Sequence, residues 1–220
     1  MATNVSCTHR CAGRGLAALG VGGFSLLLFA CGGSIEANAP PVITAQPADQ
    51  ATVEGRLTTF SVNASGVPVP SLQWERMDPG GSTWTVIPGE SSNTYHFMPS
   101  SPDNGTQFRV QATNALGAAA SSPARLTVYY ISTVVLSPDF LTVLVGNTAT
   151  FNVIASGNPV SLGYQWHRLA GGVVTDIPGA IFPSYSTPPA TAVDDGTQFS
   201  CTISNAFVDR SSAWATLYVR

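Results

Sequence analysis

Few residues in this sequence of 220 amino acids could perform acid–base or nucleophilic chemistry. His96 and His167 are the only histidines after residue 30. A Ser-His-Asp site needs an oriented trio and an oxyanion hole, and the sequence contains no Gly-x-Ser-x-Gly motif. All nine basic residues are Arg, which excludes a Lys Schiff base. We therefore expect a protein that is not an enzyme, with both histidines on the surface or at strand edges.

The strongest candidate for a metal site is Asp194-Asp195-Gly196, because adjacent carboxylates suit a hard cation such as Ca²⁺. The first half of the chain has Asp103-Asn104-Gly105 at the corresponding place, with one carboxylate fewer. A turn is the competing explanation, since Gly supplies a positive φ and Asp accepts hydrogen bonds from nearby backbone amides. We favour the turn and expect neither a metal nor a cofactor.

Only Cys201 lies beyond residue 31, whereas Cys7, Cys11 and Cys31 precede it. Exported proteins usually pair their cysteines, and Cys201 has no partner in the folded part of its own chain. We expect it to be a small buried apolar side chain. The alternatives are an intermolecular disulfide and a reactive thiol.

Charge excludes one large class of partner. Charged residues make up 10% of the chain and the formal net charge is -3. A nucleic-acid-binding protein needs a basic face. We therefore expect no nucleic-acid partner.

The first thirty residues have the composition of an export signal. Arg10 and Arg14 form a positive region without acidic residues, and an apolar run extends from Gly15 to Ala30. This run is shorter than the roughly 20 residues of a transmembrane helix. It has the form of a secretory signal.

The end of this run, with Leu28, Ala30 and Cys31, resembles a bacterial lipobox, although Phe29 is larger than the usual residue. The resemblance implies cleavage between Ala30 and Cys31 and acylation of Cys31, which would join the protein to a membrane. Gly32 in place of Asp implies sorting to the outer membrane. We therefore expect a signal peptide over 1–30 and a lipidated tether over 31–40. An uncleaved anchor helix, or an ordinary signal with an incidental Cys, is the alternative.

The rest of the sequence contains two copies of one unit, with equivalent residues roughly 91 positions apart. Thr59-Phe60-Ser61-Val62 returns as Thr150-Phe151-Asn152-Val153, and Gln73-Trp74 returns as Gln165-Trp166. Further matching pairs are Ile87-Pro88-Gly89 with Ile177-Pro178-Gly179, Gly105-Thr106-Gln107-Phe108 with Gly196-Thr197-Gln198-Phe199, and Asn114 with Asn205.

Each unit has the pattern of short strands separated by turns. Thr58, Phe60 and Val62 lie two residues apart, as do Phe108 and Val110, which places each set on one face of a strand. Turn-forming Pro and Gly residues lie between these runs, and no useful helical periodicity occurs after the signal. The pattern predicts an all-β fold in which each unit of about 90 residues forms a β-sandwich.

These motifs resemble the I-set kind of bacterial immunoglobulin-like domain, over 41–129 and again over 130–220. The resemblance places Trp74 and Trp166 in the centre of each sandwich. It places Val62 with Val110, and Val153 with Cys201, at the two positions that form the inter-sheet disulfide in many relatives. Neither unit can therefore form that disulfide, so apolar packing must replace a bond that typically contributes about 2–4 kcal/mol.

Such sandwiches host many functions, so the fold alone does not identify a ligand. We expect a lipid-anchored envelope protein that binds a protein or a glycan, as an adhesion-type module does. The alternatives are a structural spacer or assembly subunit of an envelope complex and, more remotely, an accessory domain of an enzyme. Candidate contacts are the loops Asp78 to Thr83 and Ala170 to Val174. Tyr129 and Tyr130 either contact a partner or pack between the two domains.

Overall fold

The computed structural model describes residues 38–220, and this part of the chain is built from β-strands joined by turns and two short 3₁₀ helices. The all-β fold predicted from the sequence is confirmed. No helix within the described part has the length and apolar character needed to cross a membrane. The predicted signal peptide, with Ala30 and the lipidation residue Cys31, lies outside the described residues.

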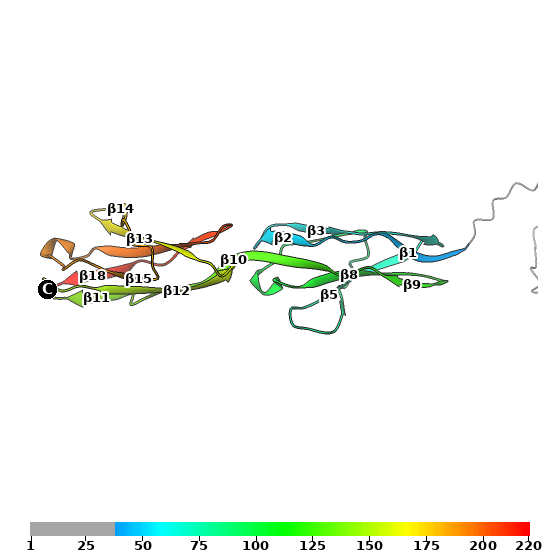
Figure 1. The fold of residues 1–220 in the computed structure, drawn as a ribbon, viewed down its shortest axis with the longest axis horizontal. Coiled ribbons are helices and arrows are strands. Elements are labelled where there is room, and N and C mark those ends of the chain that lie inside the picture. The colour runs from blue at the N-terminus through cyan, green and yellow to red at the C-terminus, as the bar shows by residue number, and fades with distance from the viewer. Residues whose placement is uncertain (1–37) are drawn as a thin grey trace, which may run out of the picture. The chain divides into compact units, whose positions relative to one another are not determined.

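The first repeat folds into a sandwich of two layers (Figure 1). One layer contains the pairs β1–β4 and β3–β7, and the other follows the order β2-β10-β8-β5-β6 with β9 on β8. The strands of this repeat are β1 (Ala39–Ala45), β2 (Gln50–Val53), β3 (Thr58–Ser61), β4 (Asn63–Val67), β5 (Ser71–Met77), β6 (Thr85–Val86), β7 (Thr94–Phe97), β8 (Gln107–Asn114), β9 (Gly117–Ala120) and β10 (Ala124–Ser137). The helix η1 (Ser101–Asp103) precedes β8.

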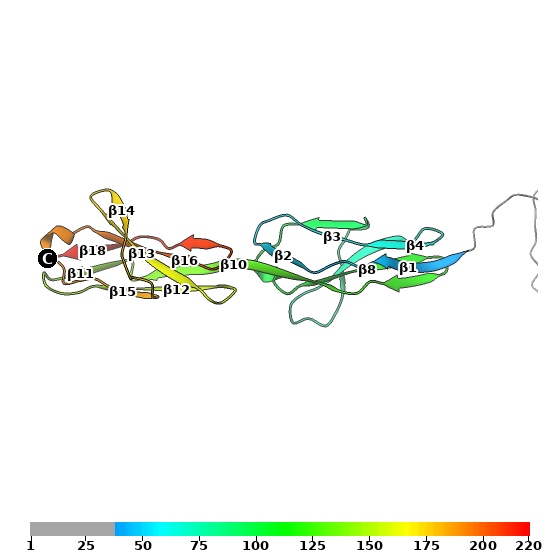
Figure 2. The ribbon, with the colours of Figure 1, turned by 45° about the horizontal axis from the view of Figure 1, so that its top comes forward.

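The second repeat reproduces this arrangement (Figure 2). One layer has the order β10-β12-β15, and the other has the order β11-β18-β16-β13-β14 with β17 on β16. The strands of this repeat are β11 (Phe140–Val143), β12 (Thr150–Asn158), β13 (Gly163–Ala170), β14 (Val173–Asp176), β15 (Ser184–Ser186), β16 (Gln198–Ser204), β17 (Asp209–Ser211) and β18 (Ala215–Val219). The helix η2 (Ala192–Asp194) precedes β16.

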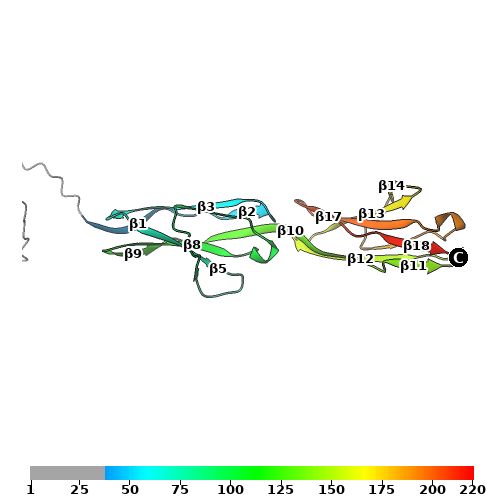
Figure 3. The same cartoon turned by 180° about the vertical axis from the view of Figure 1, so that it is seen from behind.

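Each repeat has one parallel strand pair among its antiparallel partners. Strand β2 runs parallel to β10, with Leu126 opposite Gln50. Strand β11 runs parallel to β18, with Leu217 opposite Leu141, and lies beside it in Figure 3. Because Leu126 and Leu217 are equivalent in the repeat, the same pairing closes both sandwiches.

The two repeats share strand β10. Its first half pairs with β2 and β8, and its second half, from Tyr130 to Ser137, pairs with β12. The boundary predicted between residues 129 and 130 therefore falls inside a strand. Tyr130, Ile131 and Ser132 continue this strand and pair with Asn158, Gly157 and Ser156 of β12.

Each sandwich has its own apolar core, formed by every second residue of its strands, where the side chain points inward. Phe60, Trp74, Phe108, Val110 and Leu126 are fully buried in the first. Phe151, Trp166, Cys201 and Ile203 are fully buried in the second, together with Leu217 at 1% exposure. Burial of a Leu, Val or Phe side chain typically contributes about 1.5–3 kcal/mol, so these cores supply the main favourable term in folding.

Candidate functional site

The repeated Gln-Trp pair fixes the strand at the centre of each sandwich. The Trp74 indole Nε1 donates to the Ser92 carbonyl at 2.9 Å, and that of Trp166 donates to the Phe182 carbonyl at 2.8 Å. The neighbouring Gln165 amide donates to the Ile177 carbonyl at 3.0 Å, as Gln73 does to Ile87 at 2.8 Å. These bonds connect the Gln-Trp motif to the Ile-Pro-Gly motif of the same repeat. The residues matched in the sequence therefore form one structural unit.

The acidic turns hold the backbone of each repeat. The Asp194 carboxylate accepts hydrogen bonds from the Thr191 amide at 2.9 Å and from Arg168 at 2.8 Å. The Asp195 carboxylate accepts one from the Val219 amide at 2.9 Å. Asn104 replaces Asp195 in the first repeat and accepts from the Val128 amide at the same distance. The interpretation of Asp194-Asp195-Gly196 as a turn is therefore confirmed, because both carboxylates bind the backbone of their own chain.

The two positions in each repeat at which the resemblance places an inter-sheet disulfide are apolar here. Val62, Val110, Val153 and Cys201 are all buried. Cys201 is a free thiol, and burial raises its pKa to about 11. A thiol with such a pKa is poorly nucleophilic at neutral pH. Cys201 therefore occupies the core as a small apolar side chain.

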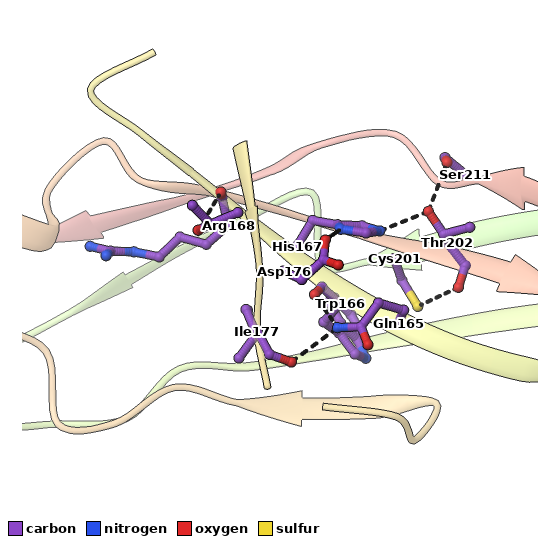
Figure 4. Close-up of polar contacts among 10 residues, drawn as sticks. Gln165, Trp166, His167, Arg168, Asp176, Ile177, Cys201, Thr202 and Ser211 are labelled. Carbon is purple, nitrogen blue, oxygen red and sulfur yellow. Dashed lines mark hydrogen bonds and ion pairs between the residues drawn. The ribbon is translucent and has the colours of Figure 1, made fainter. Parts of the chain in front are cut away.

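A chain of polar side chains crosses the outer face of the sheet in the second repeat (Figure 4). Trp166 points into the core, so His167, the next residue of β13, lies on the opposite face. Its Nδ1 lies 2.8 Å from Asp176 Oδ1 on β14, and its Nε2 lies 2.8 Å from Thr202 Oγ1 on β16. Thr202 Oγ1 lies 3.0 Å from Ser211 Oγ on β17. We call these four residues, Asp176, His167, Thr202 and Ser211, the His167 chain.

The His167 chain has the connectivity of an acid, a histidine and a hydroxyl, which in hydrolases activates a nucleophile. Such catalysis also needs backbone or side-chain donors aimed at the developing oxyanion. Thr202 lies within β16 between two paired strands, opposite Gln165 of β13 and Ser211 of β17. The backbone N–H groups of these strands form the hydrogen bonds of the sheet. The arrangement presents ordered polar groups on a sheet face, which suits hydrogen bonding to a ligand.

The outer face of the first repeat has a different cluster at the same register. Glu75 of β5 lies opposite Arg109 of β8, just as His167 lies opposite Ser200. Arg109 Nε donates to Glu75 Oε2 at 2.7 Å, and its guanidinium carbon lies 4.3 Å from the centre of the Trp84 ring. We call Glu75, Arg109 and Trp84 the Trp84 cluster. Arg and Trp are enriched in binding hot spots, so this cluster is a second candidate contact surface.

The remaining sequence candidates take structural or exposed positions. His96 is exposed on β7, where its Nδ1 lies 2.7 Å from Thr59 Oγ1. The loop expected from Ala170 to Val174 is shorter than predicted. Ala170 ends β13, Val173 begins β14, and only Gly171 and Gly172, both with positive φ, form the turn. A two-residue hairpin turn needs such φ values, which Gly supplies without steric cost.

Tyr129 and Tyr130 pack where the repeats meet. The Tyr129 ring stacks on Phe207, with centroids 3.7 Å apart and planes 4° from parallel. The Tyr130 carbonyl accepts a hydrogen bond from the side-chain amide of Asn205 at 3.2 Å. The equivalent Asn114 donates in the same way to the Ala39 carbonyl at 2.9 Å. The repeated Asn therefore fastens the strand that enters each sandwich, a role that its spacing in the sequence did not reveal.

Comparison with known proteins supports the architecture. A family model described as an immunoglobulin domain matches residues 40–114. Endoglucanase C of Cellulomonas fimi is 32% identical over 181 residues, and protein sidekick-1 of Homo sapiens is 29% identical over 136 residues. These matches cover 82% and 60% of this chain but only 16% and 6% of those proteins.

A solved structure extends the likeness to both repeats. The crystal structure of the four N-terminal Ig domains of Dscam1 isoform 7.44 superposes with a TM-score of 0.55 at 18% identity. The superposition covers 84% of this chain and 47% of the Dscam1 chain. At this level of identity the likeness concerns the fold. The first repeat matches the immunoglobulin domain model over residues 40–114, and both repeats have the immunoglobulin-like fold.

Proposed function

We propose that this chain is a non-enzymatic binding module of the bacterial cell envelope, attached to the outer membrane by lipidated Cys31. Its ligand is a protein or a glycan, recognised through the outer sheet faces that carry the His167 chain and the Trp84 cluster. The observation that carries this proposal is the contrast between the repeats. Their core residues are nearly the same, whereas these side chains on the outer faces differ. They are held in place by hydrogen bonds and, for Trp84, by the guanidinium of Arg109.

The comparisons support a modular role. The region like this chain is a small part of endoglucanase C and of sidekick-1. A unit that occurs within larger and different proteins is expected to contribute binding or positioning rather than a reaction of its own. The endoglucanase relative makes a polysaccharide the first glycan to test.

Lipid anchoring is tested by the intact mass of the protein from its native membrane fraction, measured without reducing agent. A mature chain that begins at Cys31 and carries acyl groups would support the anchor, because more than one acyl chain is needed for stable attachment. An unmodified chain cut after Ala30 would overturn the anchor. It would leave the binding role to be judged by the next experiment.

Binding is tested by sedimentation with crystalline cellulose and with peptidoglycan, and by cross-linking in intact cells followed by mass spectrometry. Trp84→Ala and Thr202→Val each change one outer face without entering a core. Val69→Ala changes an apolar side chain that is 87% exposed and belongs to neither face, so it is the matched control. We expect the two face variants to lose at least one interaction that the control retains. A stable partner whose association ignores both faces would instead favour a structural spacer or assembly subunit.

A further inference from the structure

The two repeats differ in the core layer where Phe97 corresponds to Thr187. Phe97 lies opposite Thr58 in the β3–β7 pair. The Thr187 amide donates to the carbonyl of Ala149 at 2.8 Å. Because Thr58 and Ala149 each precede the repeated Thr-Phe motif, Phe97 and Thr187 are equivalent by register as well as by sequence.

In the first repeat, the Phe97 ring completes the core. Its centroid lies 5.3 Å from that of Tyr95, with the planes 14° apart, and 5.3 Å from that of Phe108. Phe97 also packs against the buried cluster as a whole. The ring therefore fills the space in front of Tyr95 and Phe108.

In the second repeat, a pocket occupies the equivalent place. Tyr185 and Phe199, which correspond to Tyr95 and Phe108, line it together with Thr187 and Leu217. Its volume is about 320 Å³. The Thr187 hydroxyl accepts a hydrogen bond from the Ala149 amide at 3.0 Å, so this short side chain is held against the backbone. The pocket is thus the space that an aromatic ring fills in the other repeat.

The pocket adjoins an exposed strand edge. Thr175 and Asp176 of β14 line it, and β14 is the last strand of its sheet, with all four residues exposed. The equivalent strand β6 has only two residues. An exposed edge offers unpaired backbone groups to an extended segment of another protein. A segment that pairs with an edge strand gains affinity from the backbone and specificity from side-chain pockets beside it.

We propose that this pocket receives the side chain of a phenylalanine or tyrosine from an extended segment of a partner protein that pairs with β14. The ring would pack on Tyr185 and Phe199 as Phe97 packs on Tyr95 and Phe108. The ion pair of Arg168 with Asp194, 2.8 Å long, borders the pocket and would face the polar part of the segment. This inference rests on the proposed binding function and names the ligand class for the second repeat.

The test is an NMR titration of the isotope-labelled chain with an acetylated, amidated pentapeptide that has one phenylalanine between two pairs of threonines. We expect shifts at Tyr185, Thr187, Phe199 and along β14. The same peptide with alanine in place of phenylalanine should bind about tenfold or more weakly, because it leaves the pocket unfilled. Equal binding of the two peptides, or no shifts at these residues, would overturn the proposal.

Variants test the pocket from both sides. Thr187→Phe places the ring of the first repeat in the second and should abolish binding, whereas Thr187→Val removes the hydroxyl, leaves the pocket open and should preserve it. Phe97→Thr should open a corresponding pocket and create a second, weaker site at Tyr95 and Phe108, because β6 offers a shorter strand edge than β14. This gain of binding is informative even if Thr187→Phe fails to fold. Peptide binding that survives in a folded Thr187→Phe variant would overturn the proposal.

Two further probes separate the peptide from other occupants. N-acetylphenylalanine amide carries the ring without a strand, and an N-methylated pentapeptide carries the ring without backbone donors. Both should bind about tenfold or more weakly than the parent peptide, because they lack the pairing with β14. If the small amide binds as well as the peptide, the site takes a small aromatic compound and the proposed occupant is wrong. A negative result in these peptide experiments would overturn the proposed occupant of the pocket. It would not affect the sedimentation and cross-linking test of the proposed function.

Discussion

Tyr129 and Phe207 form a parallel stack that joins β10 to the turn between β16 and β17, with ring centroids 3.7 Å apart. Phe207 is 50% exposed, so the stack lies at the surface and contributes little by burial alone. The hydrogen bond from Asn205 to the Tyr130 carbonyl lies beside it. The aromatic pair and this amide together link residues of the first repeat's last strand to the second repeat.

The stack predicts a measurable coupling between its two residues. In a double-mutant cycle of Tyr129→Ala and Phe207→Ala, we expect a coupling free energy of about 0.5–1.5 kcal/mol, the range for aromatic pairs. Urea unfolding of the four chains measures it. Leu116 holds the position of Phe207 in the first repeat, so a cycle of Tyr129→Ala with Leu116→Ala is the matched control and should give no coupling. Equal values in the two cycles would show that the stack adds nothing.

Replacing either of the central tryptophans should cause a large loss of stability. Trp74 and Trp166 are fully buried, and each indole also donates one hydrogen bond to a backbone carbonyl. Trp166→Ala should lower the free energy of unfolding by about 3–5 kcal/mol, because it leaves a cavity and an unpaired carbonyl. Trp166→Phe should cost less, because it keeps most of the ring volume. Denaturant unfolding tests both, and a loss under about 1 kcal/mol for Trp166→Ala would place this residue outside the core.

The lowered pKa of Asp194 predicts that the free energy of unfolding depends on pH. Hydrogen bonds from the Thr191 hydroxyl and amide, together with the Arg168 guanidinium, lower the pKa of this carboxyl below its ordinary value. A folded-state pKa below the unfolded value of about 3.9 means that its contribution is complete above that pH. The contribution is lost as the pH falls through the folded-state pKa.

Asp194→Asn should therefore lower the free energy of unfolding at pH 7 by about 0.5–2 kcal/mol, the cost of losing a capping side chain. The difference from the wild type should shrink as the pH is lowered from 4 towards 2, a window set by the ordinary carboxyl pKa of about 3.9. Urea titrations at several pH values measure it. Asp139→Asn changes an exposed aspartate and is the control. A difference that stayed constant with pH would exclude the ionised carboxylate as its source.

The sequence predicted the fold because its signals were local or repeated. Trp74 and Trp166, the alternating apolar residues and the Gly-containing turns each specify a strand, a face or a turn on their own. The two copies then confirm one another. That neither sandwich has an inter-sheet disulfide likewise followed from the residue types at Val62, Val110, Val153 and Cys201.

The candidate site was harder to predict, because it depends on side chains brought together across strands. His167, Asp176 and Thr202 are separated in sequence, and only the register of β13, β14 and β16 makes them neighbours. The pocket had a signal in the sequence, since an aromatic residue, Phe97, is replaced by the much smaller Thr187 in the second copy of the repeat. That signal becomes meaningful only when the register shows that Phe97 points into the core.

The buried position of Cys201 predicts that the fold protects its thiol from alkylation. Burial raises its pKa to about 11, so at pH 8 only about one thiol in a thousand is the reactive thiolate. Alkylation by iodoacetamide, followed on the peptide that contains Cys201 by mass spectrometry, should be slow in the native chain and fast in urea. Cys201→Val copies Val110 of the first repeat and should change the free energy of unfolding by less than about 1.5 kcal/mol, because it exchanges side chains of similar volume. Reducing agent should likewise leave the thermal midpoint unchanged, since the folded part of the chain has no disulfide to lose. Rapid alkylation of the folded chain, or a lower midpoint on reduction, would mean that Cys201 is accessible or cross-linked to another chain.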